Sequence, residues 1–131
     1  MKPIADTGLL VGFLDSSDQY HEWAARCFAD LSVALTTCEA VIAETEYLVP
    51  GSGPLLMEMV RRGTLRIVPQ LPLEAEAIGA LMKSYPKMQF ADACIVRLSE
   101  TMTDAVVYTT DKRDFLIYRR RRNETIKSIT P

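Results

Sequence analysis

Four carboxylates stand beside apolar residues in this chain, where an isolated charge would be costly to bury. They are Asp6, Glu44, Asp92 and Asp111. Asp6 and Asp111 each follow a short apolar run typical of a buried strand. In an open α/β sheet, ligands gather beyond the carboxyl ends of the strands. We therefore expect these two acids to meet in one site, although they are far apart in the sequence.

Clustered acids of this kind predict a cation site. Four carboxylates cannot all stay ionised in a dry pocket unless their pKa values separate or cations neutralise them. The only histidine is His21, and the three cysteines have no zinc-ligand spacing. Hard oxygen ligands therefore favour Mg²⁺ or Mn²⁺, as one ion or two. Such an ion activates water and stabilises charge in phosphate-ester chemistry.

The elements that would position these acids alternate along the chain. Amphipathic or apolar segments predict helices, and short apolar runs predict strands. We expect helices over residues 9–14, 20–31, 37–49, 55–62, 73–85 and 90–102, and strands over 3–6, 33–36, 65–69, 105–108 and 125–129. This alternation predicts the α/β class, with a short, mostly parallel sheet between layers of helices.

Length and composition indicate one ordinary globular domain spanning residues 1–131. The chain is 48% hydrophobic and 24% charged, with a formal net charge of −2, so the overall charge does not indicate a nucleic-acid binder.

The cysteines are expected to be buried, reduced thiols. No signal peptide or membrane-length apolar run is present, which predicts a cytoplasmic protein.

The acidic segments resemble those of one known family. Ile4-Ala5-Asp6-Thr7-Gly8, Ala43-Glu44, Phe90-Ala91-Asp92-Ala93 and Thr109-Thr110-Asp111-Lys112-Arg113-Asp114-Phe115 occur in the order found in PIN-domain ribonucleases. The resemblance is greatest to the small VapC-like toxins of type II toxin–antitoxin systems and covers essentially the whole chain. It implies a PIN-like three-layer α/β/α sandwich.

The resemblance also implies the roles of particular residues. Asp6, Glu44, Asp92 and Asp111 match the acidic catalytic and metal-binding positions of the family, and Thr7, Thr109 and Asp114 match supporting polar positions. The implied activity is Mg²⁺- or Mn²⁺-dependent cleavage of RNA phosphodiester bonds. An antitoxin partner and a homodimer are implied as well. Glu46 is a neighbouring alternative to Glu44, but it would face another side of its helix.

The densest charge on the chain is the run Arg119–Arg122. A solvated basic surface is the ordinary interpretation of such a run. The sharper hypothesis is that Lys112, Arg113, Arg120 and Arg122 contact RNA phosphates.

Several alternatives remain open from the sequence. Asp-Thr-Gly also occurs in aspartic proteases, but those proteins are all-β, and helical periodicity dominates here. Taken singly, Asp6 could be only a helix cap, Asp92 a dipole-favoured acid and Asp111 a turn former. Haloacid-dehalogenase phosphatases would need an acid where Gly8 stands, and receiver domains need adjacent acids near the first strand. A free-standing PIN nuclease of RNA processing, or a PIN-like domain that binds RNA or a partner without cleaving, would carry the same motifs.

Overall fold

Five short parallel strands form the central sheet, in the order β3-β2-β1-β4-β7. The computed structural model describes residues 1–131. The central strand β1 is almost entirely buried, which explains its apolar sequence. The strands are β1 (Lys2–Ala5), β2 (Leu35–Thr37), β3 (Leu65–Ile67), β4 (Ala105–Tyr108) and β7 (Ser128–Ile129).

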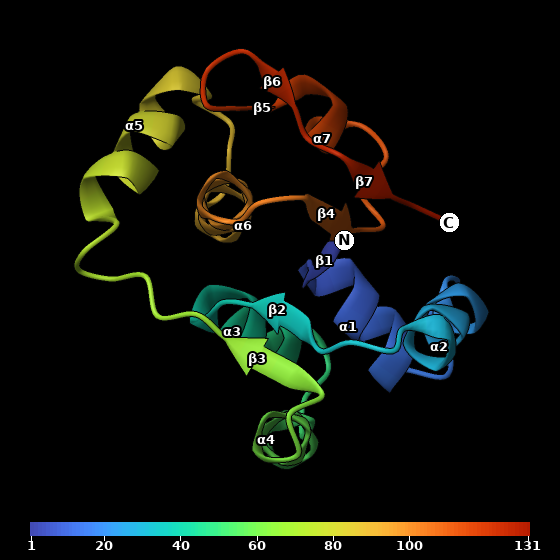
Figure 1. Cartoon of the computed structure of the whole chain (residues 1–131). Helices are drawn as coiled ribbons and strands as arrows, with labels where there is room; N and C mark the ends of the chain where they lie inside the picture. Colours follow the sequence, from blue (N-terminus) through green and yellow to red (C-terminus); the bar gives the residue numbers. More distant parts are fainter.

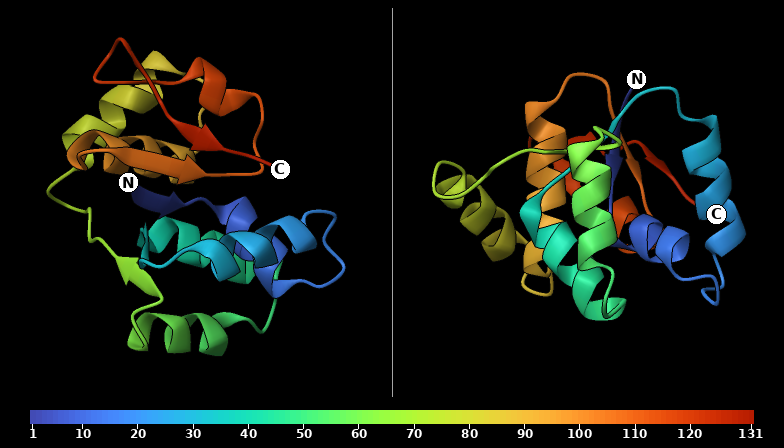
Figure 2. Two further views of the ribbon diagram at one scale, coloured as in Figure 1. Left: turned by 45° about the vertical axis from the view of Figure 1, so that its right-hand side comes forward. Right: turned by 90° about the horizontal axis from the view of Figure 1, so that it is seen from below.

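Helices cover the sheet on both sides, which confirms the predicted three-layer α/β/α sandwich (Figures 1 and 2). The helices are α1 (Thr7–Leu14), α2 (His21–Asp30), α3 (Glu39–Leu48), α4 (Gly53–Arg61), α5 (Ala75–Ser84), α6 (Phe90–Thr101) and α7 (Asp114–Ile117). In Figure 1, α1 and α2 lie on one side of the sheet, and α5 and α6 lie on the other. No helix is long and apolar enough to cross a membrane.

The pairing of β1 with β4 brings Asp6, which follows β1, next to the segment after β4 that carries Asp111. Ala5 lies opposite Tyr108 in the parallel register. Beyond the last paired residues, the backbone N–H of Asp6 donates to the carbonyl of Tyr108 at 3.0 Å. The hydroxyl of Thr37, at the end of β2, donates to the carbonyl of Ala5 at 2.8 Å. The carboxyl end of β1 is therefore held from both neighbouring strands.

The buried core explains most of the apolar periodicity. Ile95, Val96 and Leu98 of α6 are at most 1% exposed, so this helix packs against the sheet along most of its length. Cys38 and Cys94 are buried free thiols, as predicted, whereas Cys27 is free but only half-buried.

The C-terminal segment differs from the prediction of one strand over residues 125–129. The structure contains two pieces there: β6 (Glu124–Thr125) pairs antiparallel with β5 (Arg119–Arg120), and β7 joins the main sheet. Ile126, which is 7% exposed, lies between the pieces and belongs to the core. The chain therefore leaves the β5–β6 hairpin at this residue to reach β4.

Candidate active site

Asp6 is the most buried of the four acids, and both of its carboxylate oxygens have partners. It caps α1 by accepting a hydrogen bond from the backbone N–H of Thr7 at 2.8 Å. Its other oxygen accepts a bond from the hydroxyl of Thr109 at 2.6 Å. Capping and site formation are thus both roles of the same side chain.

Thr109 links Asp6 to the loop that carries Asp111. Its hydroxyl donates to Asp6 and accepts a hydrogen bond from the backbone N–H of Asp111 at 3.0 Å. The carboxylate of Asp111 in turn accepts bonds from the backbone N–H groups of Arg113 and Asp114 at 3.0 and 2.9 Å. The loop after β4 is therefore ordered by the acids themselves.

Asp92 lies in the first turn of α6, where the helix dipole favours a negative charge. Its carboxylate accepts a hydrogen bond from the phenol of Tyr118 at 3.1 Å. Tyr118 is 5% exposed and its ring packs edge-on against both Tyr85 and Phe115. This aromatic cluster fixes the phenol that orients Asp92.

Asp92, Asp111 and Asp114 form the tightest acidic group in the structure. Each offers a carboxylate oxygen, and these atoms lie within 4.8 Å of one another. Asp114, a supporting residue by sequence, belongs to this group, whereas Asp6 and Glu44 lie outside it. The geometry therefore gives Asp114 a more direct place than its motif suggested.

A pocket of about 320 Å³ opens beside this group and connects it with the remaining acids. Asp6, Glu44 and Asp92 all line it. The half-buried Glu44 makes no protein hydrogen bond or ion pair, so its carboxylate is free to act on a ligand. Glu46 is exposed and does not line the pocket, as expected from its position on α3.

Burial, together with neighbouring negative charge, raises the pKa values of two of the acids. Burial raises the pKa of Asp6 from 3.8 to about 6, against the lowering effect of the hydrogen bonds from Thr109 and Thr7. Burial likewise raises the pKa of Asp92 to about 7, with a further contribution from the charge of Asp6. Glu44 and Asp111 add repulsion at both groups. The four acids thus interact as one electrostatic unit.

These residues fit a hard divalent cation. All the candidate ligands are carboxylate oxygens, and a cation would offset both the burial and the smaller repulsion that raise the pKa values of Asp6 and Asp92. Thr7 lines the pocket, and its hydroxyl is buried without a hydrogen-bond partner, which leaves one polar group of the site unsatisfied.

The basic residues predicted to bind RNA separate into different environments. Lys112 lies over the ring of Tyr20, 5.3 Å from its centroid and beside the acidic pocket, and Arg113 is exposed on the same loop. Arg122 is exposed, whereas the side chain of Arg120 is only 15% exposed. The guanidinium of Arg120 donates to carbonyls at the C-terminal end of α6, so it holds the hairpin to that helix.

Two contributors to the site are not among the site residues predicted from the sequence. Tyr118 is one, because its contact with Asp92 joins segments 26 residues apart. Thr110 is the other. A Cβ atom at Gly8 would lie 1.9 Å from the Thr110 hydroxyl oxygen, so only glycine permits this approach of α1 to the loop after β4. The glycine of the Asp-Thr-Gly segment is visible in the sequence, but the sequence does not show that it contacts Thr110.

The fold and the acidic site together define the class of protein. The PIN domain model matches residues 4–121, and the chain belongs to the PIN domain family. A similar solved structure is that of Mycobacterium tuberculosis VapC20, a toxin that cleaves the sarcin-ricin loop. The TM-score is 0.75 at 18% sequence identity, with 86% of this chain and 92% of that chain covered. At this identity the likeness shows the fold alone. No curated protein matches the sequence.

Proposed function

We propose that this protein is a Mg²⁺- or Mn²⁺-dependent endoribonuclease and the toxin of a toxin–antitoxin pair. The observation that carries the proposal is the convergence of five carboxylates at the carboxyl ends of β1 and β4, with a pocket beside them. Membership of the PIN domain family supports nuclease chemistry. The likeness to VapC20 supports the toxin assignment.

We assign each acidic residue a role in the proposed reaction from its surroundings in the site. Asp92, Asp111 and Asp114 would hold the cation, since their oxygens already lie within 4.8 Å of one another. When bound, the cation supplies an activated water and stabilises charge on the phosphate. Asp6, held by Thr109, would attract the cation with its negative charge from the buried side of the pocket.

Glu44 is suited to accept the proton of the attacking water. It faces the pocket from α3 and has no hydrogen-bond or ion-pair partner to compete for that proton. The phenol of Tyr118 favours the ionised form of Asp92 by donating to it, which opposes the effect of burial on its pKa.

The direct experiment compares RNA cleavage by the wild type, Asp6→Asn and Glu46→Gln. We expect cleavage with Mg²⁺ or Mn²⁺ and none in excess EDTA. Asp6→Asn should lose at least about 100-fold in rate, because a preorganised charge in the site is removed. Glu46→Gln, an exposed acid on the same helix as Glu44, should cleave like the wild type.

The outcomes separate the candidate functions. Robust cleavage in EDTA would refute the metal mechanism. A wild type that binds Mn²⁺ yet leaves varied RNAs intact would favour a PIN-like domain that binds without cleaving. The complete set of acids supports catalysis over that alternative. A neighbouring gene for a small DNA-binding protein would distinguish a toxin from a free-standing RNA-processing nuclease.

The proposed partners follow from the toxin assignment. An antitoxin would block the acidic pocket.

A homodimer is supported by exposed apolar residues on α3 and α4, among them Tyr47 at 80% and Leu55 at 52% exposure. Light scattering of the purified protein should give twice the mass of the chain, and a concentration-independent monomer mass would contradict the dimer.

A further inference from the structure

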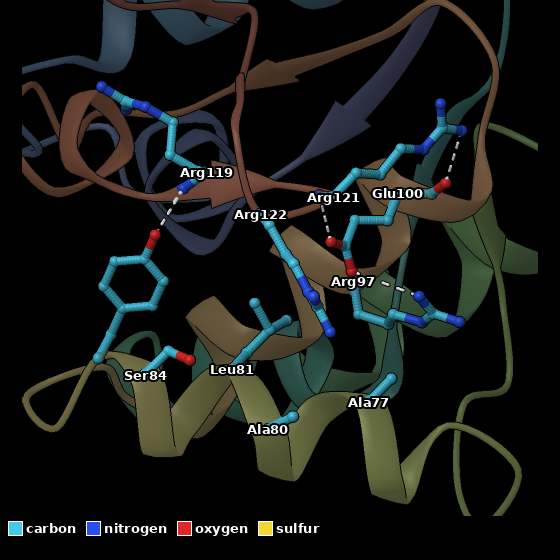
Figure 3. A pocket seen from close by; sticks show the side chains of 10 residues that line it. Ala77, Ala80, Leu81, Ser84, Arg97, Glu100, Arg119, Arg121 and Arg122 are labelled. Carbon is cyan, nitrogen blue, oxygen red and sulfur yellow. Dashed lines mark hydrogen bonds and ion pairs between the residues drawn. The ribbon is translucent and has the colours of Figure 1, made fainter.

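A second pocket, of about 520 Å³, lies between α5, α6 and the β5–β6 hairpin (Figure 3). Ala77, Ala80 and Leu81 of α5 form an apolar floor, and arginines from α6 and the hairpin stand around it. The pocket is distinct from the acidic one, since the two share no lining residue.

The lining of this second pocket contains more positive than negative side chains, with four arginines and one glutamate. Arg97 is paired with Glu74 and Glu100, and Arg121 with Glu124. The Arg119 guanidinium donates to the carbonyls that end α7. Arg122 makes no hydrogen bond or ion pair with the protein. In Figure 3 its side chain points into the pocket above Leu81.

The backbone of the hairpin indicates that these arginines are not ordinary turn residues. Arg121 and Arg122 have φ angles of 47° and 73°. Glycine or asparagine adopts this left-handed conformation more readily than a long side chain does. Backbone strain of this kind is concentrated at functional sites. The hairpin thus holds Arg122 over the pocket in an unfavourable conformation.

A chain of direct contacts connects this pocket with the acidic site. Tyr118 donates to Asp92, and its ring packs against Tyr85 with centroids 5.2 Å apart. The phenol of Tyr85 accepts a hydrogen bond from the backbone N–H of Arg119 at 3.0 Å. Because Tyr85 and Arg119 line the second pocket, one edge of it adjoins the residues that hold Asp92.

We propose that this arginine pocket binds a backbone phosphate of the RNA strand at a nucleotide outside the scissile bond. The inference rests on the proposed nuclease function for its ligand. The guanidinium fork matches phosphate geometry, and the positive charge complements the strand that leaves the acidic site. The apolar floor suits the less polar face of a ribose or base. A free acidic peptide would match the charge alone, whereas RNA also accounts for the connection to Asp92.

The test measures RNA binding apart from cleavage. Binding of a labelled single-stranded RNA is followed by fluorescence anisotropy, with Mg²⁺ present, in an Asp6→Asn background that does not cleave. Arg122→Ala and Arg122→Gly should each weaken binding about fivefold and reduce the salt slope by about 0.7, the value for one phosphate contact on a single strand. Arg122→Gly also relieves the positive φ, so its weaker binding cannot come from unfolding.

The matched control is Arg66→Ala. Arg66 is exposed and unpaired as well, but lies on β3 at the opposite edge of the sheet from β7. Its loss should leave RNA affinity within twofold of the parent. In the cleaving protein, Arg122→Gly should raise KM for a long RNA and leave kcat unchanged, because the contact is remote from the scissile bond.

The results separate the pocket from the nuclease function. If the wild type cleaves RNA but Arg122→Gly changes neither affinity nor salt slope, the pocket assignment is wrong and the nuclease stands. If the wild type cleaves nothing while RNA binding depends on Arg122, the pocket stands and the proposed function fails. Arg122-dependent binding of poly-glutamate, without any effect on RNA, would overturn the RNA assignment in favour of an acidic protein partner.

Discussion

Asp6→Asn is expected to stabilise the metal-free protein near pH 8. Folding raises the pKa of this carboxyl from 3.8 to about 6, so keeping it ionised costs about 3 kcal/mol at about 1.4 kcal/mol per pKa unit. The side chain is 6% exposed, so solvent screens little of this cost. Asparagine carries no charge, but its one amide oxygen can accept from only one of Thr7 and Thr109, so one hydrogen bond is lost at about 1 kcal/mol. The net gain is about 2 kcal/mol.

The pH dependence has a definite sign. An acid whose pKa is raised by folding binds protons more tightly in the native state, so the free energy of unfolding falls as the pH rises from below 4 to above 6. For Asp6 this fall is about 1.5 kcal/mol between about pH 5 and pH 8. The Asp6→Asn protein lacks this contribution, so the gap between the two proteins should widen with pH.

Urea unfolding in EDTA at several pH values measures this effect, with Glu46→Gln as the exposed control. A saturating concentration of Mg²⁺ should reverse the order, because the cation stabilises the wild type by mass action. A lower stability of Asp6→Asn than of the wild type in EDTA at pH 8 would refute this reasoning. It would show that the ionised, buried Asp6 does not destabilise the metal-free protein.

Three further predictions concern the supports of the site. Gly8→Ala should lower the free energy of unfolding by about 2 kcal/mol through overlap with Thr110 and abolish cleavage, and adding Thr110→Gly should restore much of the stability in urea melts. Tyr118→Phe removes the hydrogen bond that lowers the pKa of Asp92, so the acid limb of the pH–rate profile should move to higher pH; an unmoved limb would show that Asp92 does not control it. Arg120→Ala should cost about 2 kcal/mol in chemical denaturation because the α6 carbonyls lose their donor, while RNA affinity in the anisotropy assay stays unchanged.

The sequence predicts helices and strands well where their apolar pattern is strong. The apolar stripe of α6 and the buried run of β4 are long or strong enough to show their type directly. The meeting of Asp6 with the loop after β4 follows from strand direction alone, since parallel strands end at one edge.

The remainder depends on tertiary contacts without a local signal. The β5–β6 hairpin is built from Arg119 and Arg120, which have neither the alternation nor the turn residues of a hairpin. The burial of Arg120 depends on carbonyls freed at the end of α6, some 20 residues earlier. The place of Asp114 beside Asp92 requires the loop geometry that Asp111 imposes.

The central position of β1 also has a consequence for the order of events during synthesis. Asp6 meets Thr109 only when 103 further residues have been added to the chain. At translation rates of about 5–20 residues per second, this takes roughly 5–20 s. Until then β1 lacks its β4 neighbour, and the nascent chain lacks Asp111 and Asp114. A chain of this topology is therefore unable to complete its acidic site while most of it is still being made.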